Sequence, residues 1–267
     1  MKQNLPFGRL MLAIIILASL PFNLFAWGVT GHRVVGEIAS SHLSSRARKE
    51  IQKILGDESL AMAANWGDFI KSDSTYDYIY NWHYLNIDKN YSYDDLVAFL
   101  KTDSSSNVYT RVNILSDSLR KGTMPQEKKV MYLRLLIHFV GDLHQPLHIG
   151  RAADQGGNTL KLQWFGASSN MHTIWDTKLV DFQQLSYTEY ANYLNHPSKA
   201  DKQKWQKAPI SEWIFESYKY AGVIYSEYKG EDQRLSYDYN FRHIAALNNQ
   251  LLKGGVRLAG LLNDIFG

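Results

Sequence analysis

The stretch His138-Phe-Val-Gly-Asp-Leu-His-Gln-Pro-Leu-His148 decides how the chain is organised. His138 and Asp142 are four residues apart, and on an α-helix this spacing places both side chains on one face, with Cβ atoms about 5–6 Å apart. Pro146 disfavours helical backbone at the preceding residue, so we expect the helix to end near Gln145. His148 follows just past that end, where the three side chains are able to share a divalent metal ion.

Other histidines and aspartates extend this candidate site. A second His-x-x-x-Asp pair follows at His172 and Asp176, and two such pairs so close in the chain are hard to explain by packing alone. Upstream lie His32, Asp68 and His83. A catalytic zinc takes about three protein ligands, so this many candidates predict a cluster of two or three metal ions. Zinc ions about 3.5–4 Å apart can activate a water molecule, and they can stabilise the attacking and the leaving oxygen of an in-line displacement at phosphorus.

Each of these residues also has a purely structural interpretation. A single histidine on an apolar helix usually bonds a carbonyl group, and His32 or His83 alone would favour that interpretation. Asp68 and Asp176 taken alone could be surface acids. His144 points about 200° around the helix from Asp142, so we expect it to support the site or the core. Three histidines lack a paired acid at metal-ligand spacing and are expected to be structural or on the surface, namely His42, His196 and His243.

The rest of the chain predicts a mainly α-helical single domain with a short strand or hairpin region. Ser92 with Asp95, and Ser186 with Glu189, have the spacing of capping boxes. The best strand, 159–165, alternates apolar and polar residues. Residues 72–80 are expected to form a loop, 81–86 an extended or irregular segment, and 199–207 a linker or a solvated helix face. The expected helices are 33–43, 45–55, 60–71, 92–101, 109–121, 126–145, 172–180, 186–196, 211–229 and 238–266.

Composition restricts the ligands and the partners. The chain has no cysteine, so a metal site must use nitrogen and oxygen ligands, which suit zinc and, less specifically, other divalent metals. The formal charge of +3 falls to +1 without Lys2 and Arg9, which argues against a broad basic surface. A nucleic-acid substrate would therefore have to bind at a local site.

Residues 1–26 have the pattern of a secretory signal peptide. Lys2 and Arg9 precede an apolar run that is short for a membrane span, although an uncleaved anchor is the alternative. Cleavage after Ala26 would make Trp27 the first residue, with a free α-amino group. We therefore expect residues 27–267 to form the mature domain, in the periplasm or secreted. It is expected to be a monomer without membrane contact or a stable protein partner.

Taken together, these motifs resemble the zinc-dependent single-strand-specific nuclease and 3′-nucleotidase family of fungi and plants, the S1/P1 type. The resemblance covers all of residues 27–267, and Arg257-Leu-Ala resembles the family's last helix. The absence of the cysteines that crosslink eukaryotic members fits a bacterial periplasmic or secreted member. The other shared motifs are Trp27-Gly-x-x-Gly-His32, Trp66-x-Asp68, Trp82-His83-Tyr84, His138-Phe-x-Gly-Asp142-x-His-Gln-Pro-Leu-His148, Asp154-x-Gly-Gly-Asn158 and His172-x-x-Trp-Asp176.

The resemblance implies three zinc ions in a cleft. Asp142 is implied to bridge the first and third ions, and Trp27 to bind through its amino nitrogen and carbonyl oxygen. The implied ligands are Asp68, His83, His138 and Asp142 for the first ion, His148, His172 and Asp176 for the second, and Trp27, His32 and Asp142 for the third.

The implied reaction is hydrolysis of single-stranded RNA and DNA to 5′-phosphate products, with 3′-nucleotidase activity in addition. The catalytic residues would be Asp68, Lys71 and Asp142. Tyr84 would stack against an unpaired base. Two further side chains near the nucleotide would be Asn86 and Asn158. Lys71 stands where better-known members have an arginine, and Asn86 where they have an acid, so the base preference is left open.

Two other functions compete with this one. A zinc phospholipase C has a similar fold with an N-terminal tryptophan and three zinc ions, but the Asp154-x-Gly-Gly-Asn158 loop and Trp66-x-Asp68-x-x-Lys71 favour the nuclease. A non-catalytic secreted zinc-binding protein would explain the His and Asp clustering alone. It would bind zinc and show no phosphodiesterase activity.

Overall fold

The computed structural model describes residues 27–267, and the predicted signal segment 1–26 lies outside them. The described part is mainly helical with one three-stranded sheet, which confirms the predicted fold class. The helices, where η marks 3₁₀ or π turns, are α1 (Val29–Ser41), α2 (Ser45–Leu55), α3 (Leu60–Ala63), α4 (Trp66–Phe69), η1 (Ile70–Ser72), η2 (Ser74–His83), α5 (Tyr93–Thr102), α6 (Val108–Lys121), α7 (Gln126–Leu143), η3 (Pro146–Ile149), α8 (Met171–Thr173), η4 (Ile174–Lys178), α9 (Leu179–Asp181), α10 (Tyr187–Leu194), α11 (Lys199–Lys207), α12 (Ile210–Ser226) and α13 (Tyr237–Phe266). The strands are β1 (Lys161–Trp164), β2 (Ala167–Asn170) and β3 (Arg234–Leu235).

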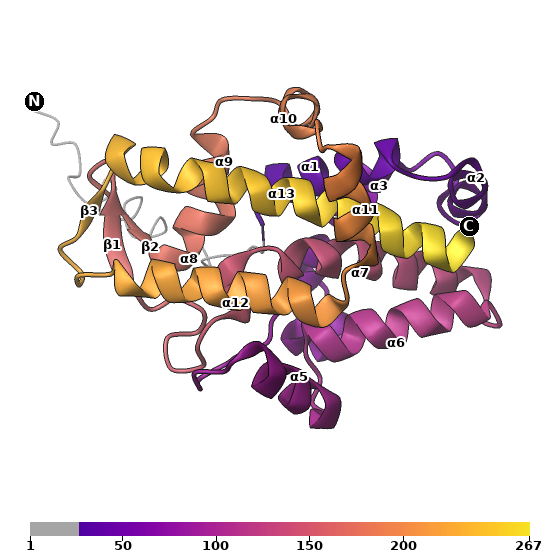
Figure 1. The fold of residues 1–267 in the computed structure, drawn as a ribbon, viewed down its shortest axis with the longest axis horizontal. Helices are drawn as coiled ribbons and strands as arrows, with labels where there is room; N and C mark the ends of the chain where they lie inside the picture. Colours follow the sequence, from indigo (N-terminus) through magenta and orange to yellow (C-terminus); the bar gives the residue numbers. More distant parts are fainter. Residues whose placement is uncertain (1–26) are drawn as a thin grey trace, which may run out of the picture.

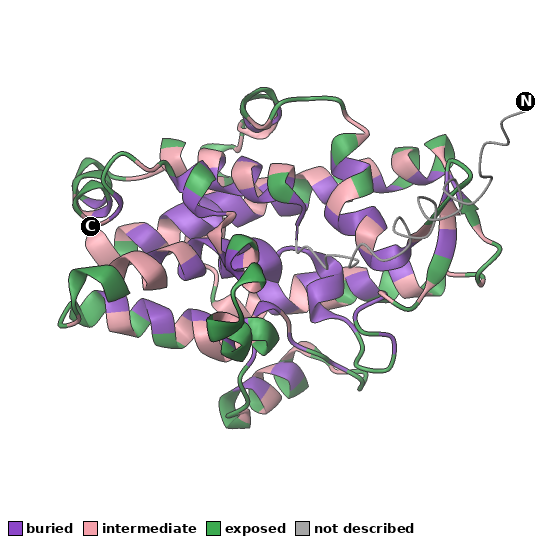
Figure 2. Ribbon diagram, turned by 180° about the vertical axis from the view of Figure 1, so that it is seen from behind, coloured by how far each residue is buried: buried purple, intermediate pink, exposed green. Residues whose placement is uncertain are grey.

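Helix α7 is the centre of the molecule. Every residue from Leu135 to Gly150 is buried, so the end of this helix is covered on all sides and not on one face only (Figure 2). The helix ends at Leu143, two residues before the predicted end at Gln145. Gln145 is extended instead, and its side chain accepts a hydrogen bond from the backbone of Leu147, which begins the short turn η3 with Pro146 in its first position.

The other long helices enclose α7. Helix α13 runs along the whole long axis of the molecule, beside α12 and from the sheet to the end where α2 lies (Figure 1). It packs against α1, α2, α7 and α11, and α6 packs against both α7 and α13. No helix within residues 27–267 combines the length and the apolar character needed to cross a membrane.

The sheet lies at one end of the molecule (Figure 1). Strands β1 and β2 form an antiparallel hairpin; β1 lies within the strand predicted at 159–165, and β2 follows it. Phe165 and Gly166 make its two-residue turn with φ values of 50° and 82°, as a type I′ turn requires at both positions. Strand β3 adds two residues parallel to β1, and the sequence pattern did not predict it.

Local differences from the predicted elements are concentrated between α3 and η2. The single helix expected over 60–71 is divided into α3, α4 and η1. The expected loop 72–80 is instead most of the 3₁₀ helix η2, where Asp73 accepts a hydrogen bond from the backbone of Thr75. Ser186 and Glu189 form the predicted capping box, whereas at α5 only the side chain of Ser92 caps the backbone. Helix α11 buries no residue, which confirms the solvated helix face.

Candidate metal centre

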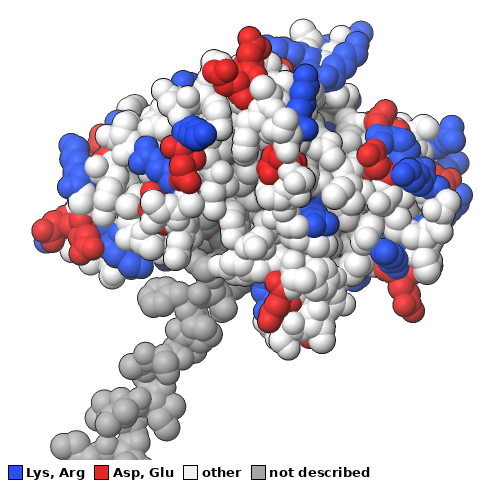
Figure 3. Space-filling view, turned by 90° about the horizontal axis from the view of Figure 1, so that it is seen from below, with Lys and Arg blue, Asp and Glu red and all other residues white. Residues whose placement is uncertain are grey.

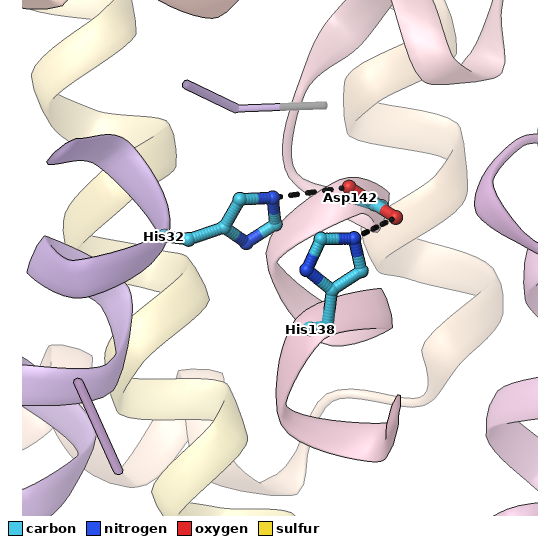
Figure 4. Close-up of side chains that lie close together, drawn as sticks. All are labelled: His32, His138 and Asp142. Carbon is cyan, nitrogen blue, oxygen red and sulfur yellow. Dashed lines mark ion pairs between the residues drawn. The ribbon is translucent and has the colours of Figure 1, made fainter. Parts of the chain in front are cut away.

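The two residues that organise the sequence lie together on α7. Asp142 Oδ2 is 3.3 Å from Nε2 of His138, and both side chains are fully buried. Helix α1 contributes His32, whose Nε2 lies 3.4 Å from the other carboxylate oxygen, Oδ1. Figure 4 shows both imidazoles directed at this carboxylate from the two helices. The three side chains form the first group able to hold a metal ion.

Glycines allow this close approach. A Cβ atom on Gly141 would lie 2.6 Å from Nδ1 of His32, and one on Gly67 would lie 2.5 Å from Cδ2 of His138. The two imidazole rings stack with centroids 4.0 Å apart and planes inclined by 18°. Larger residues at either glycine would displace a ring, so the glycines set the spacing between α1, α4 and α7.

A second group shares His138 with the first. It adds Asp68 from α4 and His83 from the end of η2. Nδ1 of His83 lies 3.1 Å from Nε2 of His138 and 3.0 Å from Oδ2 of Asp142, while Oδ1 of Asp68 lies 3.7 Å from Nε2 of His138. These contacts place Asp142 against both groups at once.

The third group consists of His148, His172 and Asp176. Nε2 of His172 lies 3.0 Å from one carboxylate oxygen of Asp176, and Nε2 of His148 lies 3.8 Å from the other. Asp176 is in the π-helical turn η4, and the side chain of Gln145 donates a hydrogen bond to its carboxylate. The structure thus brings all eight His and Asp candidates into three adjoining groups.

The histidines are oriented as metal ligands commonly are. Nδ1 of His138, His148 and His172 each donates to a backbone carbonyl, of Ala64, His83 and Gly156, at 2.7 Å. A carbonyl can only accept a hydrogen bond, so Nδ1 of each ring carries the proton. Nε2 is then unprotonated and is directed into the cluster. Five buried atoms of the cluster residues have no hydrogen-bond partner among residues 27–267, namely both ring nitrogens of His32, Nε2 of His83 and His148, and Oδ1 of Asp142. Buried polar atoms are normally satisfied, so these atoms fit divalent metal ions.

The electrostatics of the cluster point the same way. Burial lowers the pKa of His32 to about 4, so its imidazole is neutral and able to bind a metal at neutral pH. Burial raises the pKa of Asp142 to about 8, despite the opposing effect of His138. Without a cation the carboxylate is therefore costly to ionise, and a bound metal ion supplies the missing positive charge.

Lys71 accompanies the carboxylate of Asp68. Its Nζ lies 2.6 Å from Oδ1 of Asp68, and a quarter of its side chain is exposed. Burial alone would raise the pKa of Asp68, but His138 and Lys71 outweigh burial and lower it. The lysine therefore lies between the metal groups and solvent.

Trp27 lies beside the third group. Its side chain is fully buried, and the backbone N–H of the following residue, Gly28, donates to the carbonyl of Asp176 at 2.7 Å. A Cβ atom on Gly31 would lie 3.2 Å from the Trp27 side chain. The start of the described chain is thus fixed between α1 and η4, and the role of Trp27 as a ligand stays a prediction.

A cavity of about 300 Å³ opens over the second and third groups. His83, His148 and His172 form its metal-facing wall. The four residues expected to contact substrate also line it, namely Lys71, Tyr84, Asn86 and Asn158. The phenol of Tyr84 donates to Asn81 at 2.6 Å, and Asn158 donates to the carbonyl of Gln155 at 2.8 Å.

Two residues of this cavity with polar side chains, Tyr80 and Gln155, were missed by the sequence reasoning. Tyr80 lies in the segment expected to be a loop, and its ring meets that of Tyr84 edge to face at 6.2 Å. Gln155 has a φ of 53° inside the Asp154–Asn158 motif. The Asp154–Asn158 motif contains Gln155 and could have indicated that it lies near the site. The segment that forms η2 has no apolar periodicity from which the position of Tyr80 could be predicted.

The remaining histidines serve the core or the surface, as expected. His144 donates to the carbonyl of Val140, and its Nε2 lies 3.2 Å from the guanidinium of Arg257, which binds Glu216. His42 bonds Asn195, and His243 contacts Tyr220 and Glu227.

The fold and the three groups define a mainly helical protein with a buried centre suited to several divalent ions, an arrangement typical of metal-dependent hydrolases. A sequence model of the S1/P1 nucleases matches residues 27–267. The chain therefore belongs to the S1/P1 nuclease family, and it is a hydrolase of the phosphodiesterase class. Both the recognised family and the predicted enzyme class are confirmed.

Similar proteins match over nearly their full length. Endonuclease 2 of Arabidopsis thaliana is 27% identical, with 100% of this chain and 99% of that protein covered. Nuclease S1 of Aspergillus oryzae is 27% identical, with 99% and 98% covered, and nuclease P1 of Penicillium citrinum is 28% identical, with 90% and 98% covered. The alpha toxin structure from Clostridium absonum is 16% identical and aligns with 92% of this chain and 66% of its own, but its TM-score of 0.43 does not establish a common fold.

Proposed function

We propose that this chain is a secreted, zinc-dependent endonuclease that hydrolyses single-stranded RNA and DNA to 5′-phosphate products, with 3′-nucleotidase activity at the same site. One observation carries the proposal. Three adjoining His/Asp groups are rich in buried atoms without partners, and the second and third of them border a cavity that is also lined by a lysine, a tyrosine and two asparagines.

The proposed zinc ligands correspond to the three groups, although the ions are numbered differently. The second group with Asp142 would hold the first ion, the third group the second ion, and His32 and Asp142 of the first group, with Trp27, the third ion. Asp142 would bridge the first and third zinc ions, because Oδ1 faces His32 and Oδ2 faces His83. Bound zinc would supply Lewis acidity and lower the pKa of the water that attacks phosphorus. The sets are Asp68, His83, His138 and Asp142 for the first ion, His148, His172 and Asp176 for the second, and Trp27, His32 and Asp142 for the third.

Lys71 stabilises negative charge on the phosphate. Its ammonium lies at the cavity wall, held at 2.6 Å from Asp68. A cation that is already held in place stabilises the transition state more than a free cation in solution would. Asp68 orients this lysine as well as contributing to the second group, so we assign both residues to catalysis together with Asp142.

Tyr84 supplies the surface for an unpaired base. Its ring lines the cavity, and the hydrogen bond to Asn81 fixes its orientation. Stacking on an aromatic ring needs a base that has left its own stack, which favours single strands. Asn86 and Asn158 line the same cavity and would donate to or accept from the nucleotide.

The predicted signal segment and the position of Trp27 support the proposed secretion. Removal of residues 1–26 would give Trp27 a free amino group beside α1 and η4, where its neighbour Gly28 bonds Asp176. No observation in the structure favours the phospholipase or the non-catalytic zinc-binding protein, and the family membership favours the nuclease.

The test is digestion of single-stranded RNA by zinc-loaded protein that begins at Trp27, followed by identification of the product ends. We expect 5′-phosphate products, loss of activity with a chelator and recovery with zinc. Protein shown to carry zinc that cleaves neither RNA nor DNA would contradict the proposal. A phosphatidylcholine assay would then separate the phospholipase from the zinc-binding protein.

A further inference from the structure

A second hollow lies beside the cavity of the candidate metal centre. It has a volume of about 220 Å³. Asn86 and Ala152 line the first cavity, while their chain neighbours Ile87 and Arg151 line the second. Two chain segments therefore form a common wall, and a polymer bound at the metal centre would reach the second hollow by crossing this wall.

The common wall is a fixed structure. The N–H of Ile87 donates to the carbonyl of Gly150 at 2.8 Å, which pairs the two segments as in a short ladder. The carboxylate of Asp88 accepts from the N–H of Ala152 at 2.9 Å. This contact holds the carboxylate at the wall, and the cations that line the hollow outnumber it.

Three cationic residues line the hollow, namely Lys89, Arg151 and Lys219, against the single acid Asp88. All three are exposed, and none forms an ion pair with an acid in residues 27–267. On the face seen in Figure 3, by contrast, Lys and Arg are interspersed with Asp and Glu. The hollow thus brings together three cations with a single acid.

The guanidinium of Arg151 is held in place by Tyr225 before a ligand binds. It lies over the ring of Tyr225, 4.1 Å from the centroid. The Tyr225 hydroxyl accepts from the backbone N–H of Arg151 and donates to Asp154, both at 3.0 Å. A guanidinium stacked on a ring keeps its N–H edge for an oxyanion, which suits bidentate binding of phosphate.

We propose that this hollow is a second phosphate subsite, which holds a phosphodiester of a single strand flanking the one at the metal centre. The inference rests on the proposed nuclease function. An endonuclease substrate carries a phosphate at every nucleotide, and phosphate contacts supply most of the affinity that does not depend on sequence. With no broad basic surface, that affinity has to come from local cations such as these three.

The test uses the double variant Lys89→Gln/Lys219→Gln, which removes two cations and leaves the Arg151 stack intact. Substrates are a 15-nucleotide oligothymidylate and the dinucleotide TpT, which has no flanking phosphodiester. For the 15-mer we expect KM to rise roughly tenfold and the slope of log(kcat/KM) against log salt to weaken by about 0.7 for each lost contact. For TpT, kcat and KM should not change.

The matched control is Lys49→Gln/Lys121→Gln, which removes two equally exposed lysines on α2 and at the end of α6. Equal effects of the two double variants on the 15-mer would overturn the subsite. An equal rise of KM for TpT and the 15-mer would also overturn it, because the lysines would then act at the metal centre.

Binding separates the subsite from the nuclease function. Anisotropy of a fluorescent 15-mer with nuclease-resistant phosphorothioate linkages reports binding, while cleavage is measured separately on the unmodified 15-mer. Wild-type protein that binds through Lys89 and Lys219 without cleaving would uphold the subsite and contradict the nuclease. Cleavage with binding unchanged in the double variant would uphold the nuclease and contradict the subsite.

Discussion

Asp142 Oδ1 lies 3.4 Å from Nε2 of His32, a contact that joins α7 to α1 across the interior of the molecule. Its other oxygen, Oδ2, lies 3.0 Å from His83 and 3.3 Å from His138. The two oxygens of one buried carboxylate therefore face imidazoles of different groups, which is the geometry of a carboxylate that bridges two metal ions.

We predict that Asp142→Asn loses two zinc ions per molecule. The amide keeps the shape of the side chain but loses the charge and one acceptor oxygen that a bridge needs. The matched variant Asp176→Asn should lose one ion, because that acid belongs to the third group alone. Zinc per protein, measured by atomic emission after gel filtration, checks both. Loss of one ion or none from Asp142→Asn would show that Asp142 does not bridge two ions.

Lys71→Met is expected to lower kcat/KM for single-stranded RNA by roughly 10²- to 10³-fold, as removal of an electrostatic donor in an enclosed site does. The bound zinc should be retained, because the lysine is not a ligand. Lys71→Arg keeps the charge and should retain much more activity. We would measure cleavage rates and zinc content for both variants. Near wild-type rates in Lys71→Met would show that the lysine has no role in catalysis.

The accuracy of the sequence-based predictions varied along the chain for physical reasons. The spacing of His138 and Asp142 predicted their contact, because both lie on one regular helix. The chain from Leu60 to His83 was harder, since short α and 3₁₀ turns have no apolar periodicity, and its actual turns bring Tyr80 to the cavity. Strand β3 has two residues, too few for an alternating pattern. The glycine contacts around His32 depend on packing between distant helices and leave no local signal.

Zinc binding should release a proton from Asp142 at pH 7. Burial holds the pKa of this acid at about 8 in the metal-free protein, so it is mostly protonated at pH 7 and must ionise to bind metal. His32, with its pKa lowered to about 4, has no proton to release. Zinc affinity should therefore fall as the pH falls below about 8. Calorimetry at pH 7 in two buffers of different ionisation enthalpy should give different heats, and the difference should shrink at pH 9. Equal heats at pH 7 would contradict the assignment.

The free amino group of Trp27 can be tested by one added residue. Protein that begins at Trp27 should bind three zinc ions, whereas protein with a single alanine in front should bind two, because an amide nitrogen is a poor ligand. Gly28 would still bond Asp176, so the third group should keep its ion. The measurements are zinc content and nuclease rate. Three bound ions and full activity in the extended protein would show that the amino group of Trp27 is not a zinc ligand.

Gly141→Ala should destabilise the metal-free protein, whereas Gly222→Ala should stabilise it. Both glycines lie inside long helices, where alanine gains about 0.5–1 kcal/mol. At Gly222 a Cβ atom meets nothing within 4 Å, but at Gly141 it would lie 2.6 Å from Nδ1 of His32. That ring is fully buried and stacked on His138, so it has little room to move, and overpacking of this kind costs about 1–3 kcal/mol. Urea unfolding of both variants, with the chelator present, gives the free energies of unfolding. An increase in stability for Gly141→Ala comparable to that for Gly222→Ala would show that α1 and α7 are not held at this spacing by the glycine.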